Sequence, residues 1–264
     1  MSTRSSYEPG VPCWVELSGT PDIEASERFY GDLFGWEMPE LPNSAEMGGY
    51  RRAKKDGHDV AGVSPPMQDG QPCVWATYVS VADAAATLAK AGEAGGQTIA
   101  DVLDVMGMGK MAVFSDPEGA VIGIWEPGSF AGAELVNEPG AFAWNELNSR
   151  DPDAARSFYG DVFGWEFVEH EIASDAGGGT YVEFTVGGRS AGGILDMRGR
   201  VPEQVPPNWL VYFAVDDADA AVEKINAGGG SVVMGPVDIP AGRFAVGMDP
   251  QGAAFAVIKG PEER

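Results

Sequence analysis

Two glutamates are the residues of this sequence best placed to do chemistry. Glu16 lies in the segment Trp14-Val15-Glu16-Leu17, and Glu146 lies in the matching segment Trp144-Asn145-Glu146-Leu147. Side chains alternate between the two faces of a strand, so Trp14 and Glu16 share one face, opposite the more apolar set of Cys13, Val15 and Leu17. A carboxyl group in apolar surroundings has a raised pKa and can act as a general acid or base near neutral pH. Glu16 and Glu146 are therefore the candidate catalytic residues.

A structural role for these glutamates is the alternative. Lys110 and Arg243 occupy equivalent positions on later predicted strands. If Glu16 meets Lys110 and Glu146 meets Arg243, the ion pairs would fix the geometry of the sheet. Arg243 could instead orient a ligand carboxylate or phenolate through its planar guanidinium group. The sequence leaves these roles open.

The elements that must position these residues are arranged in an internal repeat. Residues 29–37 read FYGDLFGWE and residues 158–166 read FYGDVFGWE, so eight of nine positions match at a shift of 129. Further along the chain, a DPxG segment at 116–119 answers another at 249–252. Residues 127–140 have the Pro and Gly content of a linker. The repeat predicts two domains, residues 1–130 and 137–264.

Each domain divides again into two modules. Asp22 precedes an amphipathic segment that Gly35 closes, and Asp151 and Gly164 bracket its copy, which is typical of capped helices. Alanine-rich segments at 83–92 and 217–228 carry similar signals, so four helices are expected. Alternating runs predict a strand before each helix and about three after it. The expected fold is α+β, with modules at about 8–68, 71–130, 137–200 and 204–264.

The fourfold unit, the FYGDxFGWE helix exit and the DPxG turn before the last strand resemble the vicinal oxygen chelate superfamily. That superfamily includes glyoxalase I, bleomycin-resistance proteins, fosfomycin-resistance enzymes and type I extradiol dioxygenases. The resemblance implies four βαβββ modules paired into two glyoxalase-like domains. Each domain would be a curved sheet whose concave face, or cup, holds the ligand, with helices on the convex face. The chain more closely resembles the two-domain actinobacterial branch described as 27 kDa antigens or hydroxylases, whose relatives appear beside aromatic polyketide biosynthesis.

The resemblance also indicates where metal ligands would stand. The first-strand positions fall near Trp14 or Trp144 and, in the partner modules, at Ala76 or Leu210. The positions on the last strands fall at Ala61, Gly123, Ala191 and Ala256. None of these residues binds a divalent ion, and the two histidines, His58 and His170, lie elsewhere. We therefore expect no metal and no cofactor, with a shifted carboxylate-rich site at Glu16 and Glu146 as the alternative.

Small residues beside large aromatic ones suggest a slot for a planar ligand. The resemblance places both kinds in the cups, where aromatic walls and a small floor would stack an aromatic molecule. The alternative is that these aromatic side chains fill the cups as core. Trp36, Trp165, Trp75 and Trp209 are expected to pack on the helix side. The candidate ligand-binding residues are Trp14, Tyr78, Lys110, Gly123, Trp144, Tyr212, Arg243 and Ala256.

Composition limits the partners. With 17 Lys and Arg against 40 Asp and Glu, the net charge of −23 disfavours nucleic acids and anionic membranes. The polar N-terminal stretch has no apolar run of the kind found in signal peptides, so a cytoplasmic protein is expected. Its oligomeric state, monomer or homodimer, stays open.

We expect metal-independent binding of a small planar or aromatic metabolite, for sequestration, resistance or an accessory role in secondary metabolism. The alternative is an enzyme of the lyase, isomerase or hydroxylase/dioxygenase type with an atypical site. A third hypothesis is a scaffold protein that acts through its surface.

Overall fold

The computed structural model describes residues 2–41, 44, 47–172 and 178–261. In its first half the order is β1 (Pro12–Ser18), α1 (Ile23–Phe34), β2 (Arg51–Lys55), β3 (His58–Ser64), β4 (Val74–Ser80), α2 (Ala84–Glu93), β5 (Gln97–Asp104), β6 (Gly109–Ser115) and β7 (Val121–Pro127). The second half continues with β8 (Phe142–Ser149), α3 (Pro152–Phe163), β9 (Glu166–Glu171), β10 (Thr180–Val186), β11 (Arg189–Asp196), β12 (Asn208–Ala214), α4 (Ala218–Ala227), β13 (Ser231–Ile239), β14 (Gly242–Met248) and β15 (Ala254–Lys259). The α+β fold is confirmed.

The strands form two mixed sheets, one for each half. The first has the order β2-β3-β1-β4-β7-β6-β5, and the second has the order β13-β14-β15-β12-β8-β11-β10-β9. In each, the first strands of two modules pair antiparallel at the centre, β1 with β4 and β8 with β12. Each of these strands is flanked by the parallel last strand of its own module. The central positions of β1 and β8 bring Glu16 and Glu146 to the middle of their sheets.

The first module departs from the repeated pattern. Among the described residues of this module two strands follow α1, and the place of a third is taken by an isolated bridge between Glu37 and Lys54. Pro39 follows shortly after Glu37 and has no backbone N–H to donate to a ladder, which accounts for the early end of the pairing. This difference leaves seven strands in the first sheet against eight in the second.

The cap signals produced the helices that they predicted. Asp22 accepts a hydrogen bond from the Ala25 amide at 2.8 Å, and Gly35 ends α1 in the left-handed region with φ +73°. Asp151 and Gly164 do the same for α3. Asp83 and Asp217 are the N-caps of α2 and α4. The predicted four helices are therefore the four present in the described part of the chain.

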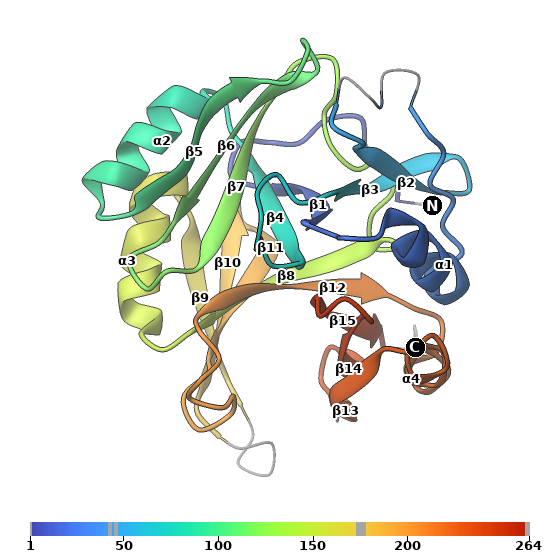
Figure 1. Ribbon diagram of the computed structural model, residues 1–264. Coiled ribbons are helices and arrows are strands. Elements are labelled where there is room, and N and C mark those ends of the chain that lie inside the picture. Colours follow the sequence, from blue (N-terminus) through green and yellow to red (C-terminus); the bar gives the residue numbers. More distant parts are fainter. Residues whose placement is uncertain (1, 42–43, 45–46, 173–177, 262–264) are drawn as a thin grey trace.

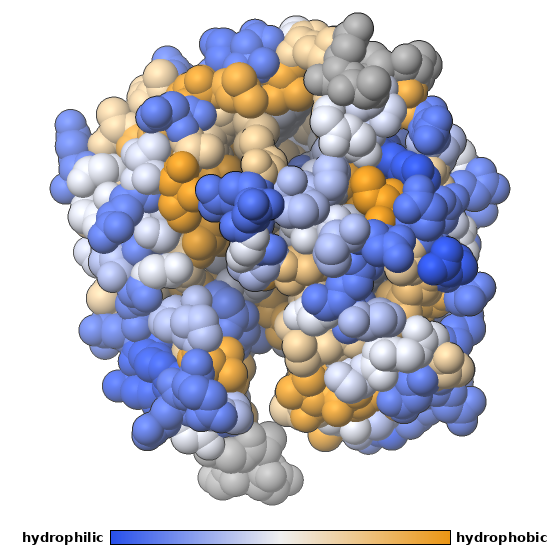
Figure 2. All heavy atoms as spheres, viewed as in Figure 1, coloured by the Kyte–Doolittle hydropathy of each residue, from blue (hydrophilic) through white to orange (hydrophobic). Residues whose placement is uncertain are grey.

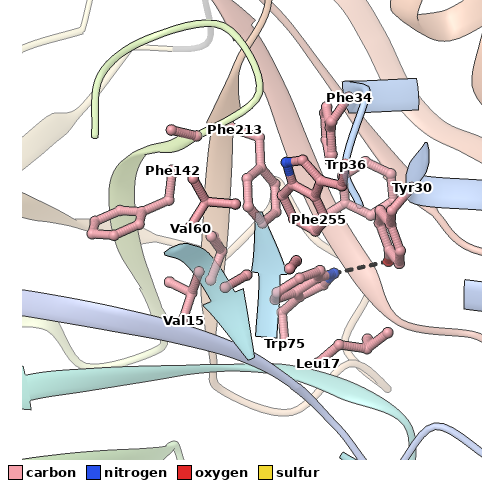
Figure 3. Packing of buried hydrophobic residues seen from close by; sticks show 14 of the residues in the cluster. Val15, Leu17, Tyr30, Phe34, Trp36, Val60, Trp75, Phe142, Phe213 and Phe255 are labelled. Carbon is pink, nitrogen blue, oxygen red and sulfur yellow. Dashed lines mark hydrogen bonds between the residues drawn. The ribbon is translucent and has the colours of Figure 1, made fainter. Parts of the chain in front are cut away.

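The helix-covered faces of the two sheets pack against each other. One core joins β1, β3 and α1 to β12, β15 and α4, and a second joins β4, β6 and β7 to β8, β11 and α3. In Figure 1, α1 and α4 lie together on the right, while α2 and α3 lie together on the left. Figure 3 shows the first core, where Trp75 from one domain lies among Phe213 and Phe255 from the other.

The repeated sequence motifs hold the two domains together. The Tyr30 hydroxyl of α1 donates to Asp249 Oδ2 at 2.9 Å, in the DPxG turn of the other domain. The Tyr159 hydroxyl of α3 donates to Asp116 Oδ2 at 3.0 Å in return. Trp75 and Trp209 each donate an indole N–H to the same tyrosine oxygens, on the helix side as predicted. These buried reciprocal bonds give the tyrosine of the motif the same role in both halves.

The surface is largely hydrophilic in the view of Figure 2. An exception at its lower edge lies over β13 and β14, where the edge strand β13 exposes Val233, Met234 and Val237. No helix in the described residues is both long and apolar enough to cross a membrane.

Candidate functional site

The sheet face turned away from the helices carries the candidate residues. We call this face the first cup in the seven-stranded sheet and the second cup in the eight-stranded sheet. Cys13, Val15 and Leu17 are buried in the core between the domains, so their neighbours Trp14 and Glu16 face the first cup, as predicted. Trp144 and Glu146 face the second cup in the same way. The site is built from these residues outward.

Glu16 is a half-buried carboxyl group with few partners. Ser64, which shares its face, donates a hydrogen bond to Glu16 Oε1 at 2.7 Å, and this is the one donor that the described residues give it. Burial raises the pKa of Glu16 to about 7, and the Ser64 hydrogen bond offsets part of that rise. Glu16 is thus able to accept or release a proton near neutral pH.

Two tyrosines and a tryptophan surround Glu16. The Trp14 indole donates to the Tyr50 hydroxyl oxygen at 3.2 Å, and its ring meets Phe130 edge-on with centroids 5.0 Å apart. Burial and the charge of Glu16 raise the pKa of Tyr50 and of Tyr78 well above the ordinary value, so both keep their protons. Within the described residues, neither hydroxyl donates to another group. Both are therefore available as donors to a ligand.

Glycines provide the floor on which these rings lie. Gly62 pairs with Glu16, and a Cβ added there would overlap the Tyr50 hydroxyl. Gly123 pairs with Tyr78, and a Cβ added there would overlap the Tyr78 ring. Only glycine allows this close approach without displacing the rings. Gly123 therefore faces the cup, as predicted.

The second cup contains the same set, but its polar groups satisfy one another. Tyr212 donates to Glu146 Oε1 at 2.9 Å, and Tyr181 also lies near enough to this carboxyl group to lower its pKa. The Trp144 indole donates to the Tyr181 hydroxyl oxygen at 2.8 Å. Burial again raises the pKa of Glu146 to about 7, and the two tyrosines oppose that rise. Glu146 is only 5% exposed, so the second cup is closed over its carboxyl group.

Side-chain size explains why one cup is closed and the other is not. The residue opposite Glu16 on β4 is Ala76, whereas the residue opposite Glu146 on β12 is Leu210. By the same register, Leu195 replaces Ser64, and Ala256 replaces Gly123 beneath the tyrosine. Ala76 is half-buried, whereas Leu210 is buried. The first cup thus leaves its carboxyl group accessible, and the second fills that space with apolar atoms.

The placement of Lys110 and Arg243 in the cups is wrong. Lys110 shares a face of β6 with the buried Ala112 and Phe114, and its Nζ lies 2.7 Å from Glu126 Oε1 on the helix-covered side. Arg243 shares a face of β14 with Ala245 and pairs with Asp219 of α4 at 2.7 Å. Neither contacts a cup glutamate, because a shift of one residue along a strand reverses the face. The predicted ion pairs of Glu16 and Glu146 are therefore absent.

Two of the small residues predicted to line the cups, Ala61 and Ala191, lie instead on the helix side of their strands. Ala61 is fully buried in the core between the domains, and Ala191 packs against the helix-side core. Gly62 and Gly193 face the cups in their place. Tyr50 and Tyr181 were missed altogether. The two tyrosines stand at equivalent places in the repeat, 131 residues apart, and this match in the sequence could have identified them as candidate site residues.

Comparison with known proteins establishes the class. The family model described as Glyoxalase/Bleomycin resistance protein/Dioxygenase superfamily matches residues 17–124 and 141–257, and the chain belongs to this superfamily. The predicted resemblance to that superfamily is confirmed.

Individual relatives span the whole chain. The protein named "Putative glyoxylase CFP32" from Mycobacterium tuberculosis (strain CDC 1551 / Oshkosh) is 42% identical and covers 98% of each chain. The anthracycline biosynthesis protein DnrV of Streptomyces peucetius is 36% identical and covers 96% of this chain and 94% of the relative. Among solved structures, a Mn(II)-bound glyoxalase from Novosphingobium aromaticivorans has a TM-score of 0.62 at 19% identity, covering 95% of this chain and 82% of the other. This last likeness supports the fold alone.

The donor atoms in the cups do not fit an Mn(II) ion like the one bound by the Novosphingobium aromaticivorans glyoxalase. Around Glu16 stand a serine, two tyrosines, a tryptophan and a glycine, and around Glu146 the set is equally poor in ligands. Nowhere in the described chain do three His, Cys, Asp or Glu side chains gather closely enough to hold a metal ion. A first-row metal site in a protein needs several such ligands converging on one point.

A crevice of about 490 Å³ lies outside both cups, between the end of α1 and the start of α4. Its lining includes Lys55, Asp216 and Lys224 at the boundary between the domains. It contains no aromatic ring opposite a buried carboxyl group. The first cup, which does combine aromatic rings with a half-buried carboxyl group, is therefore the better candidate site than this crevice.

The raised pKa of Glu146 predicts a pH dependence of stability. Between pH 4.5 and about 7 the folded protein holds a proton on this carboxyl group that the unfolded chain releases. The free energy of unfolding therefore falls as the pH rises through this range, and the loss is complete above about pH 7. The full effect is about 3 kcal/mol, from about 1.4 kcal/mol for each unit of pKa. Glu146→Gln should lose less stability between pH 5 and pH 8 than the wild type does, measured by urea unfolding.

Exposed Glu93 on α2 provides the control for this measurement. Glu93→Gln should leave the difference between pH 5 and pH 8 unchanged. An equal pH response in Glu146→Gln and the wild type would show that Glu146 ionises as freely in the folded protein as in the unfolded chain.

Proposed function

We propose that the first cup binds a planar aromatic metabolite without a metal ion. The observation that carries this proposal is the half-buried Glu16, which has one hydrogen-bond donor and no ion-pair partner among the described residues, beside the hydroxyls of Tyr50 and Tyr78, which donate to no other described group. A phenolic ligand would donate to Glu16 and accept from the tyrosines. Its ring would contact Trp14 and the half-buried side chains of Ala76 and Met111.

The relatives indicate the class of ligand. Two of them are named anthracycline biosynthesis proteins, DnrV and DauV, and both are 36% identical to this chain. Anthracyclines are polycyclic, planar and phenolic, which matches the chemistry of the first cup. We therefore choose a hydroxylated anthraquinone as the probe. The physiological role would be sequestration, resistance or an accessory step in secondary metabolism.

Proton transfer is a second candidate function, because the pKa of Glu16 is raised to about 7. An ionised Glu16 would take a proton from a carbon next to a ligand carbonyl, and the electron pair of that C–H bond would move onto the carbonyl oxygen. The Tyr50 and Tyr78 hydroxyls would stabilise the resulting enolate by donating hydrogen bonds. In a ligand with a C=C bond between its β and γ carbons, the enolate is conjugated with that bond, and return of the proton to the γ carbon would complete an isomerisation with no further reactant.

Glutamine substitutions in the two cups separate these functions. Quinizarin (1,4-dihydroxyanthraquinone) should quench tryptophan fluorescence saturably in the wild type. Glu16→Gln should change its Kd by no more than about tenfold, because one neutral hydrogen bond contributes about 1 kcal/mol. Glu146→Gln should leave it unchanged. An absence of saturable binding by the wild type would refute the proposal.

Exchange of the acidic C–H protons of 2-tetralone into D₂O, followed by NMR, tests the second function. If Glu16 is a catalytic base, the wild type should accelerate exchange and Glu16→Gln should lower the rate by about 10²-fold or more. Glu146→Gln is the matched control and should retain the wild-type rate. If the wild type gives no acceleration, the binding function alone stands.

A further inference from the structure

Arg52 places a cation in the first cup. It lies on β2 and pairs with Gly62, while its neighbour Ala53 is fully buried on the helix side, so Arg52 points into the cup. Its guanidinium group lies over the Phe130 ring, 5.3 Å from the centroid. Phe130 in turn meets Trp14 edge-on. Arg52 is therefore part of the same wall as the aromatic residues that surround Glu16.

The hydrogen bonds of Arg52 are incomplete. Its Nη1 donates to Asp59 Oδ2 at 2.5 Å. Its Nε is buried and has no hydrogen-bond partner in the described protein. A buried N–H without a partner is destabilising by about 1–3 kcal/mol and is uncommon in folded proteins. An acceptor supplied by a ligand would complete the set.

The charges around Arg52 also favour an anion. Asp59 is a buried carboxylate that forms ion pairs with two cations. One is Arg52, and the other is Lys54, whose Nζ lies 2.5 Å from Asp59 Oδ1. Glu134, at the rim, accepts from the Asp59 backbone amide rather than from Arg52. Glu16 does not pair with Arg52, and the pKa of Glu16 is raised rather than lowered. The Nε edge of the guanidinium thus has no anionic partner.

The equivalent position in the second cup has the opposite charge. Glu183 pairs with Gly193 as Arg52 pairs with Gly62. Its carboxylate is already used, because it lies 2.9 Å from His170 Nε2 and accepts from the Ser190 hydroxyl. In both copies this residue bonds to the equivalent position of the next strand, Arg52 to Asp59 and Glu183 to Ser190, but only Arg52 is left with a buried N–H that has no partner among the described residues. The two cups therefore differ in charge at this position.

We infer that the first cup selects a planar ligand that carries a carboxylate or phenolate on the edge next to Arg52. This inference rests on the proposed function of that cup. The Nε–H and Nη2–H bonds of an arginine form a fork that matches two oxygens of a carboxylate, and such charge-assisted bonds are stronger than neutral ones. Arg52 would fix the orientation of the ligand, with its hydroxyl or C–H edge at Glu16.

A pair of isosteric probes tests the inference. Anthraquinone-2-carboxylate should bind the wild type about tenfold more tightly than anthraquinone-2-carboxamide, because a charge-assisted hydrogen bond adds about that factor. Arg52→Gln should abolish this preference, so that the ratio of the two Kd values falls to about one. Arg52→Lys keeps the charge without the fork and should retain part of the preference. Glu183→Gln is the matched control in the second cup and should change neither Kd.

The outcomes distinguish the inference from the function on which it rests. Equal binding of the two probes by the wild type would overturn the role of Arg52 and leave the binding function standing. Failure of the wild type to bind either probe would overturn the proposed function itself. If Arg52→Gln does not fold, as judged by its thermal unfolding, the ratio of the two Kd values in the wild type and in Arg52→Lys still tests the role of Arg52.

Discussion

Ala76→Leu should weaken the binding of quinizarin to the protein by at least about tenfold, since overpacking a fitted site is destabilising by about 1–3 kcal/mol. Ala76 stands opposite Glu16 at the centre of the first cup and is half-buried. Leu210 stands at the same place opposite Glu146, where the cup is closed. The substitution therefore copies the closed cup into the open one. Fluorescence titration of both proteins measures the effect.

The duplication supplies the control for this experiment. Leu210→Ala opens space in the second cup and should leave the Kd of the first site unchanged. Ala76→Leu should retain a single folded state, because Ala76 is half-buried and gains rather than loses apolar contact. Tight binding by Ala76→Leu together with loss of binding by Leu210→Ala would mean that the ligand occupies the second cup. Tight binding by both variants would place it outside the cups, with the crevice between α1 and α4 as the next candidate.

Phe213→Ala should lower the free energy of unfolding by about 3–5 kcal/mol, the range for truncating a fully buried phenylalanine. Phe213 is inaccessible to solvent on β12 of the second domain, yet its ring contacts belong largely to the first. Its centroid lies 4.8 Å from Trp75 and 4.9 Å from Phe34. The cavity would open between the domains, as the position of this ring in Figure 3 shows. Guanidinium unfolding followed by tryptophan fluorescence measures the loss.

Val121→Ala, at a side chain that is 44% exposed on β7, is the control and should change stability by no more than about 0.5 kcal/mol. A loss of less than about 1 kcal/mol in Phe213→Ala would contradict the packing of the two helix-covered faces against each other. A loss in the expected range would show that each domain depends on the other to cover its core.

Much of the fold follows from local signals in the sequence. The repeat of FYGDLFGWE predicted two similar domains, and Asp22, Gly35 and their counterparts predicted the ends of the helices. These signals are short-range, because a capping carboxylate or a left-handed glycine acts on amides within a few residues. On β1, the alternation of apolar and polar residues was also sufficient to predict which side chains face the cup. Its two faces differ clearly, with Cys13, Val15 and Leu17 on one side and Glu16 on the other.

The cup-facing residues of the later strands could not be predicted in the same way. On β6 both faces are apolar, with Ala112 and Phe114 on one and Met111 and Val113 on the other. Alternation then shows which residues share a face but not which face is covered. A register shift between Ala53 and Lys54 adds to the difficulty where β2 meets β3. Lys110 was assigned to the wrong side for this reason, whereas Ala61 was placed by the family resemblance and lies one residue from the cup-facing Gly62.

The sequence by itself determined the duplication and the helices with their caps. It also determined that Trp14 shares a strand face with Glu16, and that Trp144 shares one with Glu146. Only the tertiary structure decided that Tyr50 and Arg52 lie beside Glu16, and that Tyr30 closes on Asp249 of the other domain. The physical reason is range. Caps and alternation act between near neighbours in the chain, whereas the register of strands and the packing of the two domains join residues more than 30 and more than 200 positions apart.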